Sequence, residues 1–163
     1  MRLFKKPAIV FLITIVSCFS HITIADAEKK DSLPTPQLLK IDGLSDADLT
    51  TLEAPWPARS LVSGVETHRF HSLFSGQVTV SIYDADDGKL KLENYPFDEF
   101  VHVLNGQAIL SVDGGISQTF KAGDSFIVPK GFTGTWEMKD NFRELIIIEK
   151  KANDAGVEIL FAE

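Results

Sequence analysis

The sequence holds one cysteine, Cys18, and it lies in an N-terminal segment that we expect to be removed. A chain cut behind this residue has no thiol, which excludes a disulfide, a cysteine-ligated metal and a cysteine nucleophile. An excess of basic residues is also lacking, since 16 Lys and Arg stand against 23 Asp and Glu, for a net charge of −7 at pH 7. Acidic proteins are poor partners for phosphate backbones and anionic membrane surfaces. We therefore expect neither nucleic acid nor a membrane surface as a partner.

The first residues, MRLFKKPAIVFLITIVSCFSHITIADA, lack the run of about 20 apolar residues that a membrane span needs. Basic residues precede a shorter apolar run, and the small-residue triplet ADA follows at 25–27. This pattern predicts a cleaved signal peptide over 1–27 and an exported protein, periplasmic or secreted. An alternative stays open, because IVSC at 15–18 loosely resembles a bacterial lipobox. In that case Cys18 would carry lipid and attach the protein to a membrane.

The segment 28–65 is predicted to be a flexible tether followed by a short N-terminal element. Charged residues and two prolines come first, which is typical of a tether. Ser45 followed by DADLTTLE combines an N-cap residue with an acidic first turn, which predicts a short helix. Pro55 and Pro57 would end that helix.

From residue 66 to 163 the pattern predicts one domain built of strands. Short runs of β-branched and aromatic residues are separated by Gly and Asp, with strands expected over 77–83, 90–94 and 143–149 and a last strand in VEILF at 157–161. Turn signals lie at Asp86-Asp87-Gly88, at Asn105-Gly106 and in DGG at 113–115. Strands at this spacing are typical of an all-β sandwich or barrel.

Two stretches carry a family pattern: YPFDEFVHVLNG at 95–106 and AGDSFIVPKGFTGTW at 122–136. Glu99 stands seven residues before Gly106, and Gly123 stands six before Pro129. These spacings resemble the two motifs of the cupin superfamily, and the GFTGTW ending is similar to its ureidoglycine aminohydrolase-like branch. The resemblance covers 77–148. It implies a single-domain jelly-roll β-barrel that pairs into a homodimer.

The resemblance also implies a metal held by two His and a Glu from the first motif and a His from the second. Here the two first-motif His positions hold Tyr95 and Glu93, and the second-motif position holds Gly134. Only Glu99 remains, whereas a transition metal normally needs three or more ligands. We therefore expect no metal and no other cofactor. A composite of Glu93, Glu99 and an upstream His stays open as the exception.

The remaining histidines and one acidic loop have simpler interpretations. His68 and His71 would lie on opposite faces of a strand, and His102 would point away from the face that carries Glu99. We interpret them as surface residues. The stretch DADDG at 84–88 alternates acidic residues as a calcium loop does, but its surroundings predict a solvated hairpin turn.

The candidate site lies at one mouth of the predicted barrel. Because side chains alternate along a strand, Tyr95, Phe97 and Glu99 would share the inward face, and Trp136 would join them from the second motif. These four are the predicted ligand-binding residues. Such a cavity suits a small molecule with an apolar or planar body and one cationic or donor group. Partners considered for the Glu99 carboxylate are the Tyr95 hydroxyl, the Trp136 indole N–H and Arg143.

Three functions remain open from the sequence. In the first, an exported cupin without a conventional metal binds a small molecule in the barrel mouth. In the second, a metal-dependent enzyme related to ureidoglycine aminohydrolase acts on a ureido or similar small nitrogenous compound, with Glu99 as the candidate catalytic residue. In the third, the barrel is filled by its own side chains and serves a structural role.

Overall fold

The structure is a computed structural model, and it describes residues 35–52, 56–64 and 67–161. The predicted signal peptide, Cys18 and the first part of the tether lie outside the described residues. The chain from Gln37 to Glu163 forms one compact unit. Among the described residues, none of the helices has the length and apolar character needed to cross a membrane.

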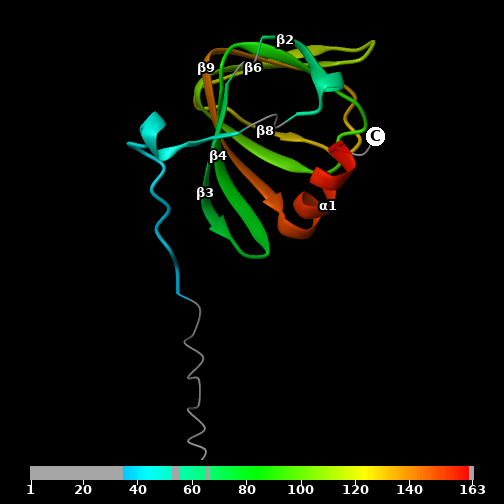
Figure 1. Ribbon diagram of the computed structural model, residues 1–163. Helices are drawn as coiled ribbons and strands as arrows, with labels where there is room; N and C mark the ends of the chain where they lie inside the picture. The colour runs from blue at the N-terminus through cyan, green and yellow to red at the C-terminus, as the bar shows by residue number, and fades with distance from the viewer. Residues whose placement is uncertain (1–34, 53–55, 65–66, 162–163) are drawn as a thin grey trace, which may run out of the picture. The chain divides into compact units, whose positions relative to one another are not determined.

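One curled sheet of nine strands forms the body of this unit (Figure 1). The strands are β1 (Thr50–Leu52), β2 (Leu61–Gly64), β3 (His68–Ser75), β4 (Val78–Ala85), β5 (Gly88–Leu92), β6 (Glu99–Val112), β7 (Ser117–Lys121), β8 (Ser125–Val128) and β9 (Gly134–Glu149). All their pairings are antiparallel. The predicted barrel of short strands is thereby confirmed as a mostly β fold.

Strand β9 organises the sheet because it is long enough to serve several neighbours. One edge pairs with β6 along its whole length, while the other edge pairs with β5 in its first half and with β4 in its second half. The far edge of β6 is shared in the same way by β8 and β7. Two long strands, each shared between shorter partners, thus turn a flat ladder into a curled one.

A bulge in β6 bends this long pair. The register of β6 against β9 shifts around Asn105, and Gly106, Asp140 and Asn141 all have positive φ, at 70°, 62° and 56°. A Cβ on Gly106 would lie 2.4 Å from the carbonyl oxygen of Lys139, so only glycine fits. The turn predicted at Asn105-Gly106 is wrong, because the chain continues through this bulge as one strand.

The core follows the alternation of the strands. In β6 and the loop before it, Tyr95, Phe97, Val101 and Val103 are buried together with Glu99, as the inward register predicts. In β9 the residues with even numbers from Gly134 to Met138 and from Phe142 to Ile148 point inward. The predicted turn at Asp86-Asp87 is confirmed as the short link between β4 and β5. The core therefore sits inside the curl of the sheet.

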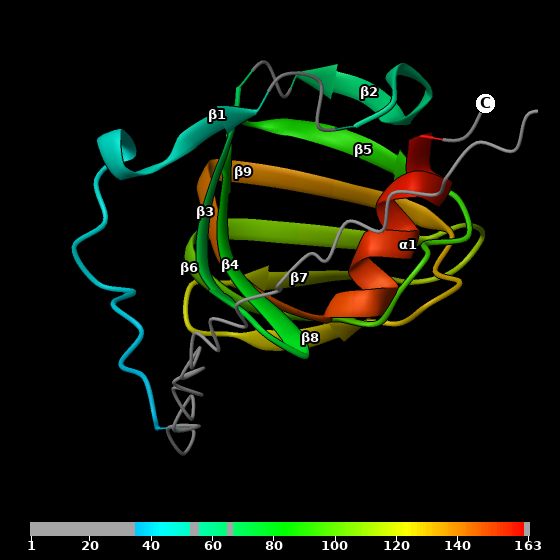
Figure 2. The same cartoon turned by 60° about the horizontal axis from the view of Figure 1, so that its bottom comes forward.

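The C-terminal segment forms a helix, α1 (Lys150–Phe161), and not the strand predicted at 157–161. The Glu149 carboxylate accepts a hydrogen bond of 2.7 Å from the backbone N–H of Ala152, which caps the first turn. A pair of i,i+4 residues, Lys150 and Asp154, supports the helix with a contact of 2.9 Å. Figure 2 shows α1 at the mouth of the curled sheet.

The predicted N-terminal helix is also wrong. Ser45 and Asp48 make the expected local hydrogen bonds, at 2.8 Å from the Ser45 N–H and 2.7 Å from its hydroxyl to the Asp48 carboxylate. These bonds close only a single 3-10 turn, η1 (Asp46–Asp48). The chain then extends as β1, because residues 50–52 pair with β3. Pairing with the sheet overrides the local preference for a helix.

Candidate functional site

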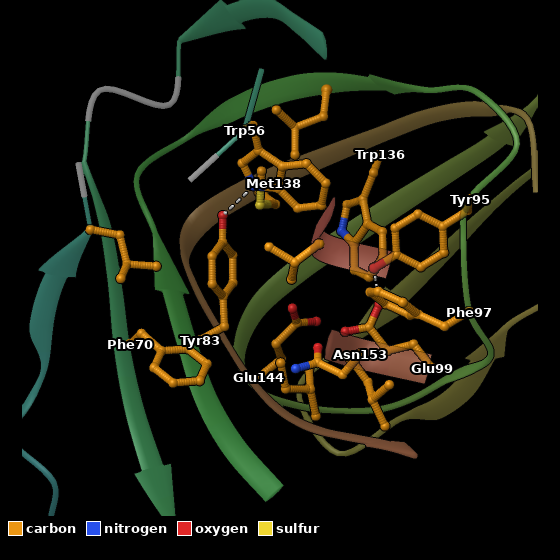
Figure 3. Close-up of a pocket in the computed structure, with 15 residues that line it drawn as sticks. Trp56, Phe70, Tyr83, Tyr95, Phe97, Glu99, Trp136, Met138, Glu144 and Asn153 are labelled. Atoms are coloured by element: carbon orange, nitrogen blue, oxygen red, sulfur yellow. Dashed lines mark hydrogen bonds between the residues drawn. The ribbon is translucent and has the colours of Figure 1, made fainter. Parts of the chain in front are cut away.

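A cavity of about 160 Å³ lies inside the curl of the sheet (Figure 3). Its lining consists mainly of aromatic and aliphatic side chains, with two carboxyl groups among them: Leu52, Trp56, Phe70, Tyr83, Leu90, Tyr95, Phe97, Glu99, Trp136, Met138, Glu144, Ile146, Ile148, Asn153 and Val157. All four predicted ligand-binding residues are in this set. An apolar cavity of about 150 Å³ is large enough to hold benzene.

Glu99 begins β6 and points into the cavity, where it is 4% exposed. The Tyr95 hydroxyl donates a hydrogen bond of 2.6 Å to its Oε2 atom. Burial raises the pKa of Glu99 to about 7, because the charged form loses its water, and the hydrogen bond from Tyr95 opposes part of this rise. Glu99 is thus a buried acid held by one donor.

Glu144 is a second buried acid, and the sequence reasoning missed it. It lies on β9 and is 3% exposed, and its Oε2 atom has no hydrogen-bond partner in the described part of the chain. Burial and then the charge of Glu99 raise the pKa of Glu144 well above its usual range. A signal was present, since the alternation that places Trp136 and Met138 inward also places Glu144 inward.

Trp136 supplies an unpaired donor to the same cavity. Its indole is 4% exposed, and no described residue forms a hydrogen bond with the Nε1–H. Leaving such a donor buried and unpaired costs about 1–3 kcal/mol. The Tyr95 and Phe97 rings meet nearby, edge to face, with centroids 4.8 Å apart. The cavity therefore offers one unpaired donor and one unpaired acceptor among aromatic rings.

A hydrogen-bonded cluster of Trp56, Tyr83 and His68 lies on one side of the cavity. The Trp56 indole N–H donates a hydrogen bond of 3.2 Å to the Tyr83 hydroxyl, and His68 Nδ1 is also hydrogen-bonded to that hydroxyl. His68 is 3% exposed, so its interpretation as a surface residue is wrong. Its neighbour on the other face, His71, binds the carbonyl oxygen of Asp48 at 2.8 Å. His68 therefore positions a wall of the cavity.

Helix α1 contributes the last part of the lining. Asn153 and Val157 reach the cavity, and Figure 3 shows the Asn153 amide beside the two carboxyl groups. Gly156 is buried against Phe97, where a Cβ would come within 2.3 Å of the ring. This close approach needs glycine, and it brings the helix onto the cavity wall.

Arg143, considered as a partner of Glu99, points to the opposite face of β9. Its guanidinium contacts Asp84 at 2.8 Å and Asp46 at 2.7 Å, and it donates to the carbonyl oxygen of Leu44 at 3.0 Å. Asp84 also pairs with Arg69 at 2.7 Å. The proposed pair between Arg143 and Glu99 is therefore wrong, because the two side chains leave the sheet on different faces.

Residues 72–146 match the family model of the EutQ-like cupin domain. The barrel is a cupin domain. A protein of Saccharolobus solfataricus named "Putative dioxygenase SSO1533" is 37% identical over 92 residues, which cover 55% of this chain and 23% of that protein. The chain thus spans less than a quarter of the length of this curated relative.

Two solved structures superpose on this chain at low sequence identity. A protein of unknown function from Pseudomonas syringae pv. tomato, of the DUF861 family, superposes with a TM-score of 0.52 at 20% identity, covering 61% of this chain and 43% of that one. The EutQ protein of Clostridium difficile superposes with a TM-score of 0.48 at 16% identity, covering 64% and 78%. The first of these likenesses supports the cupin fold and nothing finer.

The residues of this cupin domain do not fit the metal that cupins commonly hold. Glu93, at one His position, has a side chain that is 70% exposed and pairs with Lys91 at 3.3 Å. Gly134, at the second-motif His position, cannot carry a side chain, because its Cβ would lie 2.1 Å from the Ser111 carbonyl oxygen. Within the described ranges, no three or more His, Cys, Asp or Glu side chains gather to hold a metal. The composite with Glu93 and Glu99 is thereby ruled out, since Glu93 faces solvent.

The chemistry available in the cavity is that of two buried carboxyl groups. A carboxyl group whose pKa lies near 7, as that of Glu99 does, can give or accept a proton at neutral pH. The same pair can hold a positively charged ligand, because no Lys or Arg is among the lining residues. The aromatic walls favour a ligand with an apolar or planar body.

Proposed function

We propose that this cupin domain binds a small molecule inside the barrel, a molecule with an apolar or planar body and one cationic or donor group. The observation that carries this proposal is the cavity of about 160 Å³ in which Glu144 Oε2 and Trp136 Nε1 have no partner among the described residues. Buried polar groups in proteins are normally hydrogen-bonded. A ligand that supplies one donor and one acceptor satisfies both atoms.

The structural alternative, a barrel filled by its own side chains, fits these atoms less well. A solid core that served stability alone would gain from apolar side chains at both carboxyl positions. Here two acids are kept among rings and aliphatic groups, and space remains beside them. Binding is therefore the function we favour over a purely structural role.

The enzyme alternative has less support than small-molecule binding. The similarity to a protein named as a dioxygenase and the motif that resembles the ureidoglycine aminohydrolase-like branch favour a metal-dependent reaction. The donor positions do not fit a metal, so we place this reading second. Metal analysis of protein purified without chelator or a metal-affinity tag separates the two, since stoichiometric Mn, Fe, Zn or Ni would favour the enzyme.

Both tryptophans of the chain line the cavity, so intrinsic fluorescence reports directly on its occupancy. We expect benzyl alcohol, a planar molecule with one hydroxyl, to change the tryptophan emission in a saturable manner and to raise the melting temperature. Ile146→Phe should fill the cavity and abolish both effects. Ile147→Phe, a substitution on the other face of β9, is the matched control and should retain them. Absence of both effects at saturating benzyl alcohol and benzylamine would contradict binding.

We further propose that binding takes place outside the cytoplasm and in a homodimer. Export is supported by the basic start, the apolar run and the ADA triplet of 1–27. Dimerisation is supported by the sheet edges that β2 and β7 present, since exposed edges invite pairing. Light scattering of the purified protein measures the mass, and a monomer at micromolar concentration would rule out the homodimer.

A further inference from the structure

Two carboxyl groups, Glu99 and Glu144, share one cavity, and no Lys or Arg is among the described residues that line it. They come from different strands, β6 and β9, and their charges interact. The ion pairs found between two described residues lie elsewhere, on Asp46, Asp84, Asp86, Glu93, Glu137 and Asp154. Within the part of the chain that the structure describes, the pair therefore lacks the internal counter-charge that buried carboxylates normally have.

We propose that Glu99 and Glu144 form an anionic dyad that selects a small organic monocation, a protonated primary amine on an apolar body. This inference rests on the proposed binding function and names its ligand class. It stands on the position of the two acids in one cavity, on the unpartnered Oε2 of Glu144 and on the ring walls around them.

The two acids have unequal roles in this site. Glu99 already accepts a hydrogen bond from Tyr95, which fixes one of its oxygens. Glu144 has a free oxygen and lies opposite Tyr83 in the register of β4 against β9, while the Tyr83 hydroxyl is engaged by Trp56 and His68. An ammonium group has three donors and no acceptor, so it can satisfy Glu144, Glu99 and the Asn153 carbonyl oxygen together.

The walls suit the rest of such a ligand. Tyr95, Phe97 and Trp136 line the cavity near the acids, and a cation over an aromatic face gains cation–π attraction. The cavity volume of about 160 Å³ matches a ligand of the size of benzene carrying a short substituent. Anions are repelled by the dyad. A divalent metal finds only two carboxylates, which is fewer ligands than it prefers.

The direct test compares an amine with its neutral analogue at pH 8. We expect benzylamine to bind roughly 10- to 150-fold more tightly than benzyl alcohol, which is the range for one hydrogen bond to a charged group. Titrations followed by tryptophan emission and by calorimetry measure both affinities. Benzoate, with the same ring and a negative charge, should not bind.

Two variants test whether the preference for the amine depends on the dyad. Glu144→Gln keeps the shape of the side chain and should bring the two affinities within roughly threefold of each other. Glu137→Gln makes the same change on the outer face of β9, where Glu137 pairs with Lys139 at 2.7 Å, and should keep the full preference. If Glu144→Gln fails to fold, Glu99→Gln serves the same purpose, with circular dichroism and melting curves confirming the fold of each variant.

The outcomes separate this inference from the proposed function. Equal binding of benzylamine and benzyl alcohol would overturn the amine preference and leave small-molecule binding intact. Binding of neither would overturn both. A preference for amine that survives in Glu144→Gln and in Glu99→Gln would place the cation elsewhere and refute the dyad. Displacement of benzylamine by micromolar Zn²⁺ or Mn²⁺ would show that the carboxyl groups serve a metal.

Discussion

At the scale of single residues, the two buried acids determine how the protein responds to pH. The folded-state pKa of Glu99, about 7, lies above its usual value of 4.5, and the pKa of Glu144 is also raised. At pH values between 4.5 and 7, the Glu99 carboxyl group is protonated to a greater extent in the folded protein than in the unfolded chain. The contribution of Glu99 to stability is therefore complete below about pH 4.5 and is lost as the pH rises through 7.

Glu99→Gln should therefore stabilise the protein at pH 8 and change little at pH 4. The rise in pKa from 4.5 to about 7 corresponds to roughly 3 kcal/mol, which the neutral amide recovers. Urea unfolding at both pH values, with Glu137→Gln as the control on the outer face, measures the difference. A loss of about 3–5 kcal/mol would instead mean that Glu99 neutralises a buried cation.

Residue-scale reasoning from the sequence reached one acid and missed the other. Glu99 was found because the motif spacing fixed its register, and the alternation then placed Tyr95 and Phe97 beside it. Glu144 stands in the run RELIIIE, whose apolar residues predicted a strand but gave no separate sign that the acid faces inward. Arg143 was considered as a partner of Glu99, but it lies next to the inward Glu144, and one residue along a strand reverses the face.

At the scale of elements, tertiary contacts decided what local patterns could not. The run VEILF favours a strand by composition, yet Glu149 caps a helix that continues through it. Likewise, Ser45 and Asp48 favour a helix start, but pairing with β3 extends the chain after one turn. Asn105-Gly106 has the composition of a hairpin turn, and only the pairing of β6 with β9 shows it to be a bulge.

The close contact of α1 with the barrel gives a prediction in which two effects oppose each other. Replacing glycine by alanine inside a helix usually stabilises by about 1 kcal/mol. Gly156→Ala should instead destabilise by about 1–3 kcal/mol, because the new methyl group would overlap Phe97, whose ring is buried against Tyr95. Denaturant unfolding measures the sign.

Ala155→Gly, at an exposed position of the same helix, is the control and should cost only the helix propensity, about 1 kcal/mol. If Gly156→Ala stabilises the protein by the amount that Ala155→Gly loses, α1 does not press on the cavity wall. In that case the helix would contribute neither Asn153 nor Val157 to the site.

At the scale of the whole molecule, motif spacing was enough to predict the cupin barrel, because glycine and proline positions in its hairpins follow from backbone geometry. The ligand could not be predicted in this way. It depends on which side chains meet in the cavity, and those come from β1, β3, β4, β5, β9 and α1 as well as from the motifs.

The mature protein is expected to begin at Glu28, because Ala25 and Ala27 suit the small pockets that read a cleavage site. Intact mass of the exported protein checks this boundary. A mass that corresponds to a lipid-modified chain starting at Cys18 would contradict it and attach the protein to a membrane.

The central claim is that the barrel holds an organic monocation between Glu99 and Glu144, and a crystal structure of the protein with benzylamine tests it most directly. The account predicts the ring among Tyr95, Phe97 and Trp136 and the nitrogen about 2.7–3.2 Å from a Glu144 carboxylate oxygen. A barrel that remains empty at saturating benzylamine, or a ligand whose nitrogen points away from both acids, would contradict it.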